Sequence, residues 1–302
     1  MPSPRSLLES FTPIQEYLVC IDSDGCAFDT MGIKQRECFC PWMIKAFNLQ
    51  PVAEAARACK EFADLFSKTR GANRHITIKR ILTELLPSHP QVSARGFSTP
   101  QYHHYFQWIE NADSLLSDEG LRQAVAAAKD SSERLEFEHI LEWSERVNWA
   151  VKQIVSGIPP FPGVREVLVE LQGKADVVVV SATPLEALER EWAEHGIDPH
   201  VALICGQEMG TKKEHIETVG ETYQRDRVLM VGDALGDLRA AQANGVLFYP
   251  VIPGREEESW SELISEGLPK FFACEYSGLY ENELLNRFER ALPEHPPWEV
   301  KK

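Results

Sequence analysis

The uneven distribution of strand-like segments along the chain is the feature that most constrains its fold. A short apolar run, Leu18-Val19-Cys20-Ile21, stops at an aspartate, and no comparable run follows until residue 177. From there, apolar runs at 177–180, 201–205, 228–231 and 246–251 alternate with helical segments, which is typical of a parallel sheet with right-handed crossovers. Because an isolated strand leaves its edges unpaired, we expect the first run to join this later sheet.

The residues between the first run and the others have a helical pattern. Apolar residues recur at the spacing of one helix face over 78–86, where Pro87 is expected to end the helix, and 117–155 predicts two further long helices. A segment of this length is far too long for an ordinary loop. The sequence therefore predicts two domains: a doubly wound α/β core, residues 15–31 and 158–302, and an inserted all-α domain, residues 32–157.

Two helix boundaries can be predicted within the alternating region. Thr183 is followed three residues later by Glu186, a capping-box spacing that predicts a helix with Thr183 as N-cap and an end near His195. The pair Asn244-Gly245 predicts the end of another helix, because glycine readily adopts the left-handed conformation found there.

Composition and charge narrow the class of protein. A net charge of −15 and a pI near 5.1 argue against nucleic acid or an anionic membrane as the main partner. No stretch approaches the roughly 18 apolar residues of a membrane span, and no secretory signal is evident, so we expect a cytoplasmic protein. The seven cysteines are odd in number and contain no CxxC pair, which favours reduced thiols that pack in the interior. The oligomeric state stays open.

Polar and acidic residues follow three of the strand-like runs. Asp22 and Asp24 follow the first, Ser181 follows the second, and the fourth ends in Gly-Asp-Ala-Leu-Gly-Asp, which contains Asp233 and Asp237. Ligands of open α/β sheets bind outside the carboxyl ends of the strands, so we expect these side chains to share one site.

The chemistry of these residues requires a cation. Asp22, Asp24 and Asp233 could share one Mg²⁺, which prefers oxygen ligands. Ser181 offers a hydroxyl, and Lys212 a positive charge, to the oxygens of a phosphate group. Without the metal and the lysine, clustered carboxylates would repel one another and raise one another's pKa values.

Four stretches in order, IDSDGCAFDT, VVVSAT, GTKKEHI and VLMVGDALGD, resemble the motifs of the haloacid dehalogenase (HAD) superfamily, in particular its phosphatase-like members. FPGVREVLVELQ resembles the segment with which the chain re-enters the core, and Cys26 replaces the threonine that is usual after the first-motif glycine. The resemblance implies a Rossmann-like sheet of order 3-2-1-4-5. It also implies that the helical insertion is a cap of the first type, although this one is longer than most.

The resemblance assigns catalytic roles. Asp22 would be the nucleophile that forms an aspartyl-phosphate, and Asp24 would act first as general acid for the leaving group and then as base for water. Ser181 and Lys212 would hold the phosphoryl group, and Lys213 stays open as an alternative to Lys212.

The same resemblance implies a magnesium site. Mg²⁺ would be held by Asp22, the main-chain carbonyl of Asp24 and Asp233, with Asp237 supporting the site through water.

The second aspartate of the first motif favours phosphate esters, because the dehalogenases and phosphonate-cleaving members lack it. We therefore predict a Mg²⁺-dependent phosphatase acting on a small phosphorylated metabolite. A phosphomutase of the β-phosphoglucomutase type is the alternative, because the stretch KTRGANRH slightly resembles the specificity loop of such mutases. A receiver-like phosphate sensor fits less well, because its acidic pair is adjacent and it has no cap.

Substrate-binding residues are expected in the insertion and after the second run. They are Arg70, Asn73 and Arg74, which we predict to reach from a mobile lid, and Thr183. An ordinary polar loop ahead of a helix is the competing interpretation of the stretch around Arg70. The identity of the substrate and the role of residues 256–302 stay open.

Overall fold

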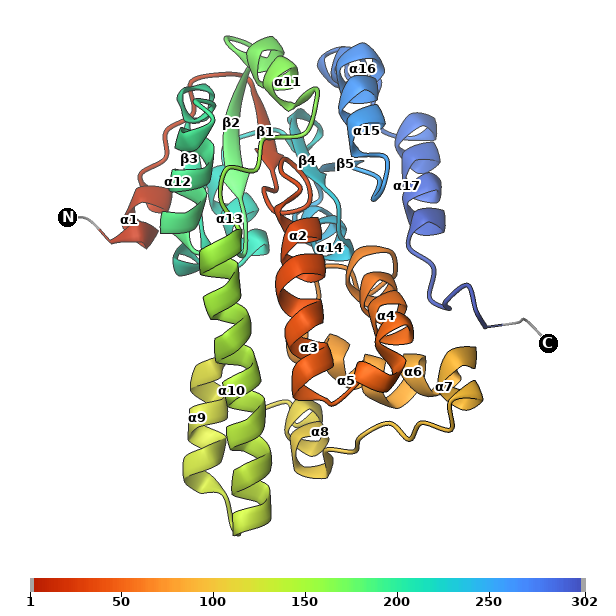
Figure 1. Cartoon of the computed structure of the whole chain (residues 1–302). Helices are drawn as coiled ribbons and strands as arrows, with labels where there is room; N and C mark the ends of the chain where they lie inside the picture. The colour runs from red at the N-terminus through yellow and green to blue at the C-terminus, as the bar shows by residue number, and fades with distance from the viewer. Residues whose placement is uncertain (1–2, 300–302) are drawn as a thin grey trace. The chain divides into compact units, whose positions relative to one another are not determined.

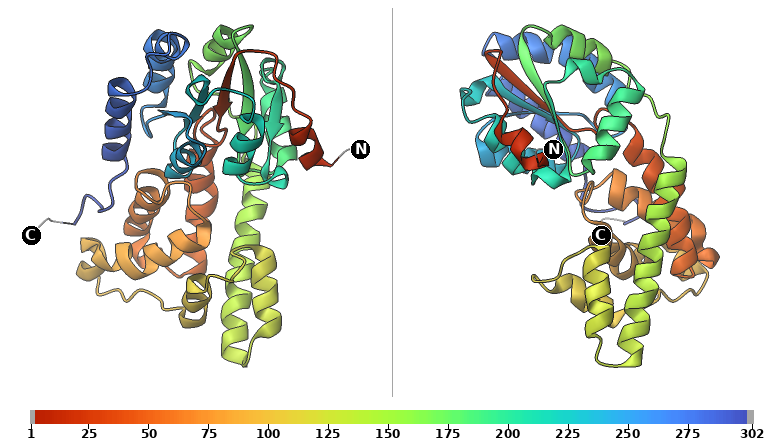
Figure 2. Two further views of the ribbon diagram at one scale, coloured as in Figure 1. Left: turned by 180° about the vertical axis from the view of Figure 1, so that it is seen from behind. Right: turned by 90° about the vertical axis from the view of Figure 1, so that its left-hand side faces the viewer.

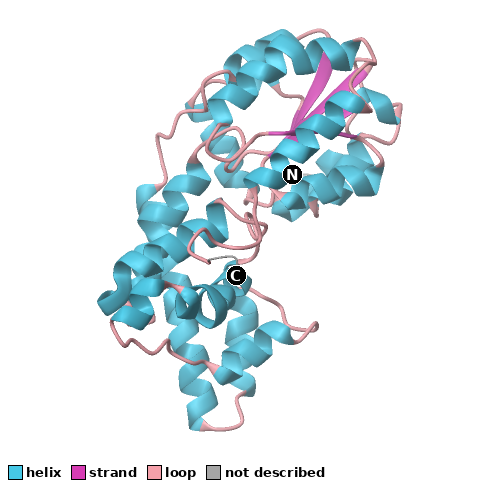
Figure 3. Cartoon of the chain, turned by 90° about the vertical axis from the view of Figure 1, so that its right-hand side faces the viewer, coloured by secondary structure: helices cyan, strands magenta, loops and turns pink. Residues whose placement is uncertain are grey.

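The computed structural model describes residues 3–299 and divides them into two compact units. Unit 1 runs to Met31 and from Gly157 to Leu292, and unit 2 runs from Gly32 to Ser156 and resumes at Pro293. All strands of the described residues lie in unit 1 (Figure 3). No helix in this part of the chain is both long enough and apolar enough to cross a bilayer.

Unit 1 contains a parallel five-stranded sheet with the order β3-β2-β1-β4-β5 (Figure 1). This confirms the predicted doubly wound fold and its strand order. The strands are β1 (Tyr17–Ile21), β2 (Ala175–Val180), β3 (Leu203–Cys205), β4 (Val228–Gly232) and β5 (Leu247–Pro250).

Helices cover both faces of this sheet because its strands are apolar on both sides. The α-helices of unit 1 are α1 (Pro4–Glu9), α11 (Val164–Leu171), α12 (Leu185–Glu194), α13 (Lys212–Val219), α14 (Leu235–Asn244), α15 (Glu256–Glu262), α16 (Leu268–Phe272) and α17 (Leu279–Ala291). Val19 and Ile21 pack with residues of α11, α12, α15 and α16, whereas Leu18 and Cys20 pack with residues of α1, α13 and α14. Short 3₁₀ turns η4 (Asp198–His200), η5 (Gln207–Met209) and η6 (Arg225–Arg227) and the π-helical η7 (Leu263–Gly267) complete this unit.

The described part of unit 2 is entirely helical and has its own core. Phe47, Tyr105 and Trp143 are among its buried aromatic residues. The helices α9 and α10 lie side by side as a hairpin (Figure 2). The α-helices are α2 (Thr30–Ile33), which begins in unit 1, α3 (Cys40–Ala46), α4 (Ala53–Leu65), α5 (Arg74–Arg80), α6 (Leu86–Ser88), α7 (Pro90–Ala94), α8 (His103–Glu110), α9 (Asp118–Ala127) and α10 (Ser131–Ile154). The 3₁₀ turn η2 (Gln50–Val52) and the π-helical η1 (Lys34–Phe39) and η3 (Ile81–Leu85) connect them.

Two predicted helix boundaries are wrong. Pro87 does not end the helix of residues 78–86, because the π-helical η3 precedes it and the helix continues as α6 to Ser88. Thr183 is not the N-cap of α12: Pro184 takes that position, and the main-chain N–H of Leu185 donates to the carboxylate of Glu208 (2.9 Å). The left-handed stop at Gly245 (φ +64°) is confirmed.

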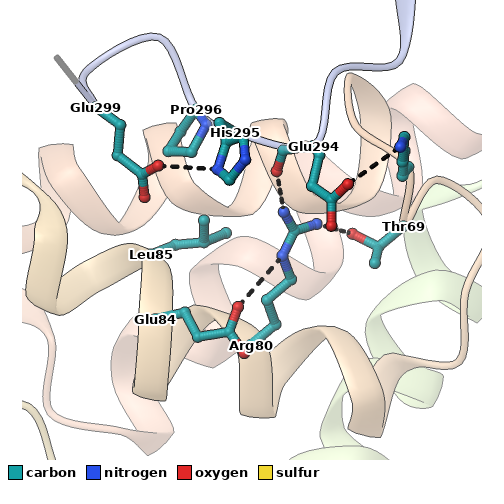
Figure 4. Close-up of a pocket in the computed structure, with 9 residues that line it drawn as sticks. Thr69, Arg80, Glu84, Leu85, Glu294, His295, Pro296 and Glu299 are labelled. Atoms are coloured by element: carbon teal, nitrogen blue, oxygen red, sulfur yellow. Dashed lines mark hydrogen bonds and ion pairs between the residues drawn. The ribbon is translucent and has the colours of Figure 1, made fainter. Parts of the chain in front are cut away.

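The C-terminal tail, residues 293–299, groups with unit 2 and not with the core to which the prediction assigned it. Polar groups around Arg80 contact the tail there (Figure 4). Its guanidinium donates to Thr69 Oγ1 (2.7 Å) and to the main-chain carbonyl of Glu294 (2.5 Å), and it pairs with Glu84 (3.8 Å). A pocket of about 240 Å³ lies here, and its charged side chains are engaged with one another.

Candidate active site

The register of the sheet brings the strand-end residues together. Ile21 of β1 pairs with Val179 of β2 on one side and with Val231 of β4 on the other. Asp22 therefore leaves β1 between the ends of β2 and β4, and its main-chain N–H still donates to the carbonyl of Val231 (3.0 Å). Ser181 and Asp233 follow β2 and β4 at the same edge.

Three carboxylates meet at this edge. Oxygen atoms of Asp22, Asp233 and Asp237 all lie within 4.8 Å of one another, and each residue is at most 3% exposed. Asp237 belongs to the first turn of α14, and its Oδ2 accepts the main-chain N–H groups of Asp233 (3.2 Å) and Ala234 (3.0 Å). The helix start thus fixes one carboxylate of the cluster.

Lys212 supplies the positive charge of the site. It is the first residue of α13, and its Nζ lies 2.8 Å from Asp22 Oδ2 and 2.5 Å from Asp237 Oδ1. A capping box between Thr211 and Glu214 fixes this end of the helix. Lys213 is exposed, so of the two candidate lysines the structure places Lys212 with the carboxylates.

Burial and charge act against each other in this cluster. Burial raises the pKa of Asp22 well above its ordinary value, Lys212 opposes that rise, and Asp237 and Asp233 add to it. Burial by itself lowers the pKa of Lys212, but the carboxylates of Asp22 and Asp237 outweigh burial and raise that pKa above its ordinary value. The lysine therefore stays charged at neutral pH.

The donor set fits a small, hard divalent cation. Three buried carboxylates lie together, and the one ammonium group of the cluster pairs with two of them, so the cluster carries excess negative charge when its acids are ionised. Oxygen ligands at a site of this kind suit Mg²⁺. The carboxylate cluster found in the described residues does not include Asp24. The predicted contribution of Asp24, through its main-chain carbonyl, stays a prediction.

Asp24 lies in a tight loop beyond β1. It is half-buried, and its Oδ1 accepts a hydrogen bond from the hydroxyl of Thr30 (2.5 Å). Gly25 has φ +86°, a conformation that L-residues rarely adopt, and its N–H donates to the carbonyl of Phe28 (2.8 Å). The glycine of the first motif is therefore needed for the turn.

Ser181 and Thr183 form a local turn after β2. The Ser181 hydroxyl accepts the main-chain N–H of Thr183 (3.2 Å), and Ser181 is 2% exposed. Thr183 is half-buried, and its carbonyl accepts the N–H of Gln207 (3.1 Å).

The three expected substrate residues of the insertion lie in unit 2, where each has a contact within that unit. Arg70 donates to the carbonyl of Leu65 (2.9 Å), and Asn73 is the N-cap of α5. Arg74 donates to Ser144 Oγ (3.1 Å) and lies over the ring of Phe39, 4.7 Å from its centroid. Their binding of a substrate stays a prediction.

Residues that the sequence did not identify hold the loop of Asp22 and Asp24. The hydroxyl of Ser23 contacts Glu191 and Trp192 of α12, and the indole N–H of Trp260 donates to the carbonyl of Cys26 (3.0 Å). The Cys26 thiol donates to the carbonyl of Val231 (3.7 Å), so the unusual cysteine of the first motif is a packed, hydrogen-bonded residue.

The chain is similar to several solved structures. A predicted phosphoglycolate phosphatase from Haemophilus somnus is 12% identical with a TM-score of 0.49, covering 83% of this chain and 97% of that one. A HAD-superfamily hydrolase of subfamily IA from Geobacter sulfurreducens is 15% identical with a TM-score of 0.40, covering 78% of this chain and 86% of that one.

A search of curated protein sequences found no match. A family model described as haloacid dehalogenase-like hydrolase matches residues 18–245, a range that includes Asp22, Ser181, Lys212 and Asp233. The chain therefore belongs to the haloacid dehalogenase-like hydrolase family.

Proposed function

We propose that the protein is a Mg²⁺-dependent phosphatase that hydrolyses a small phosphorylated metabolite through an aspartyl-phosphate on Asp22. The observation that carries this proposal is the buried cluster in which Lys212 bridges Asp22 and Asp237 beside Asp233. A nucleophilic carboxylate, a fixed cation and an oxygen-rich metal site together suit phosphoryl transfer.

Mg²⁺ would be held by Asp22, Asp233 and the main-chain carbonyl of Asp24, with Asp237 supporting them. When bound, it would offset the negative charge of the phosphoryl oxygens. Lys212 and the Ser181 hydroxyl would bind the remaining phosphoryl oxygens and orient the phosphorus towards Asp22.

The chain's own residues account for both chemical steps. A carboxylate oxygen of Asp22 attacks the phosphorus, the bond from phosphorus to the ester oxygen breaks, and Asp24 gives its proton to that oxygen. Asp24, now ionised, takes a proton from a water molecule whose oxygen attacks the phosphorus. The bond between Asp22 and phosphorus then breaks, which releases inorganic phosphate and restores both aspartates.

The experiment is a panel of phosphorylated metabolites assayed for released phosphate with MgCl₂ and, as a control, with EDTA. We expect turnover of some substrates by the wild-type protein and almost none by Asp22→Asn, which keeps the shape of the side chain but removes its charge. Activity that persists in Asp22→Asn would rule out the covalent mechanism. Isomerised sugar phosphate without net phosphate release would instead indicate the phosphomutase.

We propose that the enzyme works in the cytoplasm on a small phosphate ester and with neither nucleic acid nor membrane as partner. All seven cysteines are free thiols in the structure and six of them are buried, which supports a reducing compartment.

A further inference from the structure

Ser23 separates the two aspartates of the first motif, and its backbone holds the loop together. Its N–H donates to Asp22 Oδ1 (2.8 Å), the carboxylate whose other oxygen contacts Lys212. Its carbonyl accepts the N–H groups of Ala27 (2.9 Å) and Phe28 (3.0 Å). A movement of Ser23 would therefore change the orientation of the Asp22 carboxylate.

The Ser23 side chain is anchored in turn by α12. Its hydroxyl is fully buried, donates to Glu191 Oε2 (3.0 Å) and accepts the indole N–H of Trp192 (3.0 Å). Trp192 is also fully buried, and its ring lies edge-on to that of Phe28 with 5.7 Å between centroids. The same helix thus contacts both the start and the end of the loop.

We propose that Trp192 is a positioning residue, which acts through the Ser23 hydroxyl to orient Asp22. The inference rests on the proposed function, because it assigns to Trp192 the alignment of the nucleophile and metal ligand Asp22. Removing a group that orients a metal ligand typically lowers metal affinity or activity by about 10- to 100-fold.

The indole N–H can be removed while most of the ring is kept. Trp192→Phe leaves an aromatic ring in place but leaves the Ser23 hydroxyl without its donor. Trp143→Phe is the matched control, because the indole N–H of Trp143 in α10 is buried and has no hydrogen-bond partner among the described residues. Both variants replace a buried indole by a phenyl ring, and only the first loses a hydrogen bond.

We expect Trp192→Phe to lower kcat about 10-fold on an aryl phosphate while KM changes less than about twofold, because orientation of the nucleophile matters mainly in the transition state. Its affinity for Mg²⁺, titrated calorimetrically with MgCl₂ alone, should also fall severalfold. Trp143→Phe should match the wild type in both measurements. Ser23→Ala, which removes only the hydroxyl, should reproduce the Trp192→Phe result. If Trp192→Phe fails to fold, the Ser23→Ala variant alone tests whether this hydrogen bond positions Asp22.

The outcomes separate this inference from the proposed function. If wild-type protein hydrolyses no phosphate ester, the proposed function fails, and Mg²⁺ affinity alone decides the role of Trp192. If the folded Trp192→Phe and Ser23→Ala variants keep wild-type kcat and Mg²⁺ affinity, the hydrogen bond is only structural and the positioning inference is overturned.

Discussion

Asp22 and Asp24 are separated by one residue yet lie in different surroundings. Asp22 is 3% exposed and is held by Lys212 on one oxygen and by a main-chain N–H on the other. Asp24 is half-buried and accepts a hydrogen bond from the hydroxyl of Thr30. Different environments can give two carboxylates different roles, so the proposed nucleophile and the proposed general acid and base can occupy one short loop.

Replacing Asp24 tests its proposed role as acid and base. Asp24→Ala should lower kcat by about 100-fold or more, the usual contribution of general acid-base catalysis. The loss should be larger for alkyl phosphates than for aryl phosphates, because a poor leaving group needs the proton most. Steady-state assays with both substrate types measure this, and equal activity of variant and wild type would restrict Asp24 to the metal or the turn.

His75 gives unit 2 a specific pH dependence of stability. It is 1% exposed, contacts the hydroxyl of Tyr105 (2.7 Å) through Nδ1, and has a pKa lowered from 6.5 to about 4, first by burial and then by Arg74. The unfolded chain therefore binds the proton first as pH falls. The stability associated with neutral His75 is complete above pH 6.5 and is lost as pH falls towards 4.

The expected loss between pH 7.5 and pH 5 is roughly 2 kcal/mol in the free energy of unfolding. His75→Gln should reduce the pH dependence by about that amount in urea titrations. His215 of unit 1, whose pKa is also lowered to about 4 by burial, provides the comparison, because His215→Gln should leave the unfolding of unit 2 unaffected. If the stability of unit 2 depended on pH in His75→Gln as it does in the wild type, His75 would not be the source of that pH dependence.

At the scale of elements, the sequence predicted the sheet better than the helices. The apolar runs identified all five strands, and strand alternation with helices predicted the parallel sheet. The helix containing Ile78 continues beyond Pro87. In a regular α-helix the proline ring would clash with the main-chain carbonyl four residues earlier, and the preceding π-helical turn accommodates the ring. Pro41 and Pro269 follow π-helical turns in the same way.

The candidate site was predictable where strand ends form it and unpredictable where distant helices support it. Asp22, Asp233 and Lys212 follow from ordered motifs. Trp192 contacts Ser23, which is 169 residues away in the sequence, and Trp260 contacts Cys26, which is 234 residues away. No local sequence pattern indicates which buried indole reaches which loop.

The junction of β4 and α14 needs a residue without a side chain. A Cβ at Gly232 would lie 2.4 Å from the Cβ of Asp237 and 2.7 Å from its Oδ2. Gly232→Ala should therefore displace Asp237, weaken Mg²⁺ binding about 10-fold or more and lower kcat. Gly236→Ala in the same motif is the control, because a Cβ there meets nothing within 4 Å. Calorimetric titration with MgCl₂ should separate the two variants, and equal affinities would show that Asp237 does not support the metal.

At the scale of the whole molecule, the chain passes between its two units three times: after Met31, after Ser156 and after Leu292. The last crossing was not predicted, because its cause is a tertiary contact and not a sequence pattern. Residues 256–292 complete the core, whereas Trp298 of the tail packs against Phe62 and His89 and donates to Ser88 Oγ (3.3 Å).

The tail should therefore stabilise unit 2. Trp298→Ala should lower the free energy of unfolding of this unit by about 1–3 kcal/mol, the usual cost of removing an aromatic contact and its hydrogen bond. Trp149→Ala is the matched control, because Trp149 is 57% exposed and its loss should cost less than about 0.5 kcal/mol. Equal urea midpoints for the two variants would show that the tail contributes nothing to the stability of unit 2.

In the proposed mechanism, Asp22 carries the phosphoryl group during turnover. The most direct measurement is to quench the enzyme during turnover of its best substrate, reduce any acyl phosphate with borohydride and locate the product by peptide mass spectrometry. Reduction converts a phosphorylated aspartate to homoserine, so we expect homoserine at Asp22 and at no other aspartate. Turnover that leaves Asp22 unmodified while another aspartate is converted would contradict the aspartyl-phosphate on Asp22.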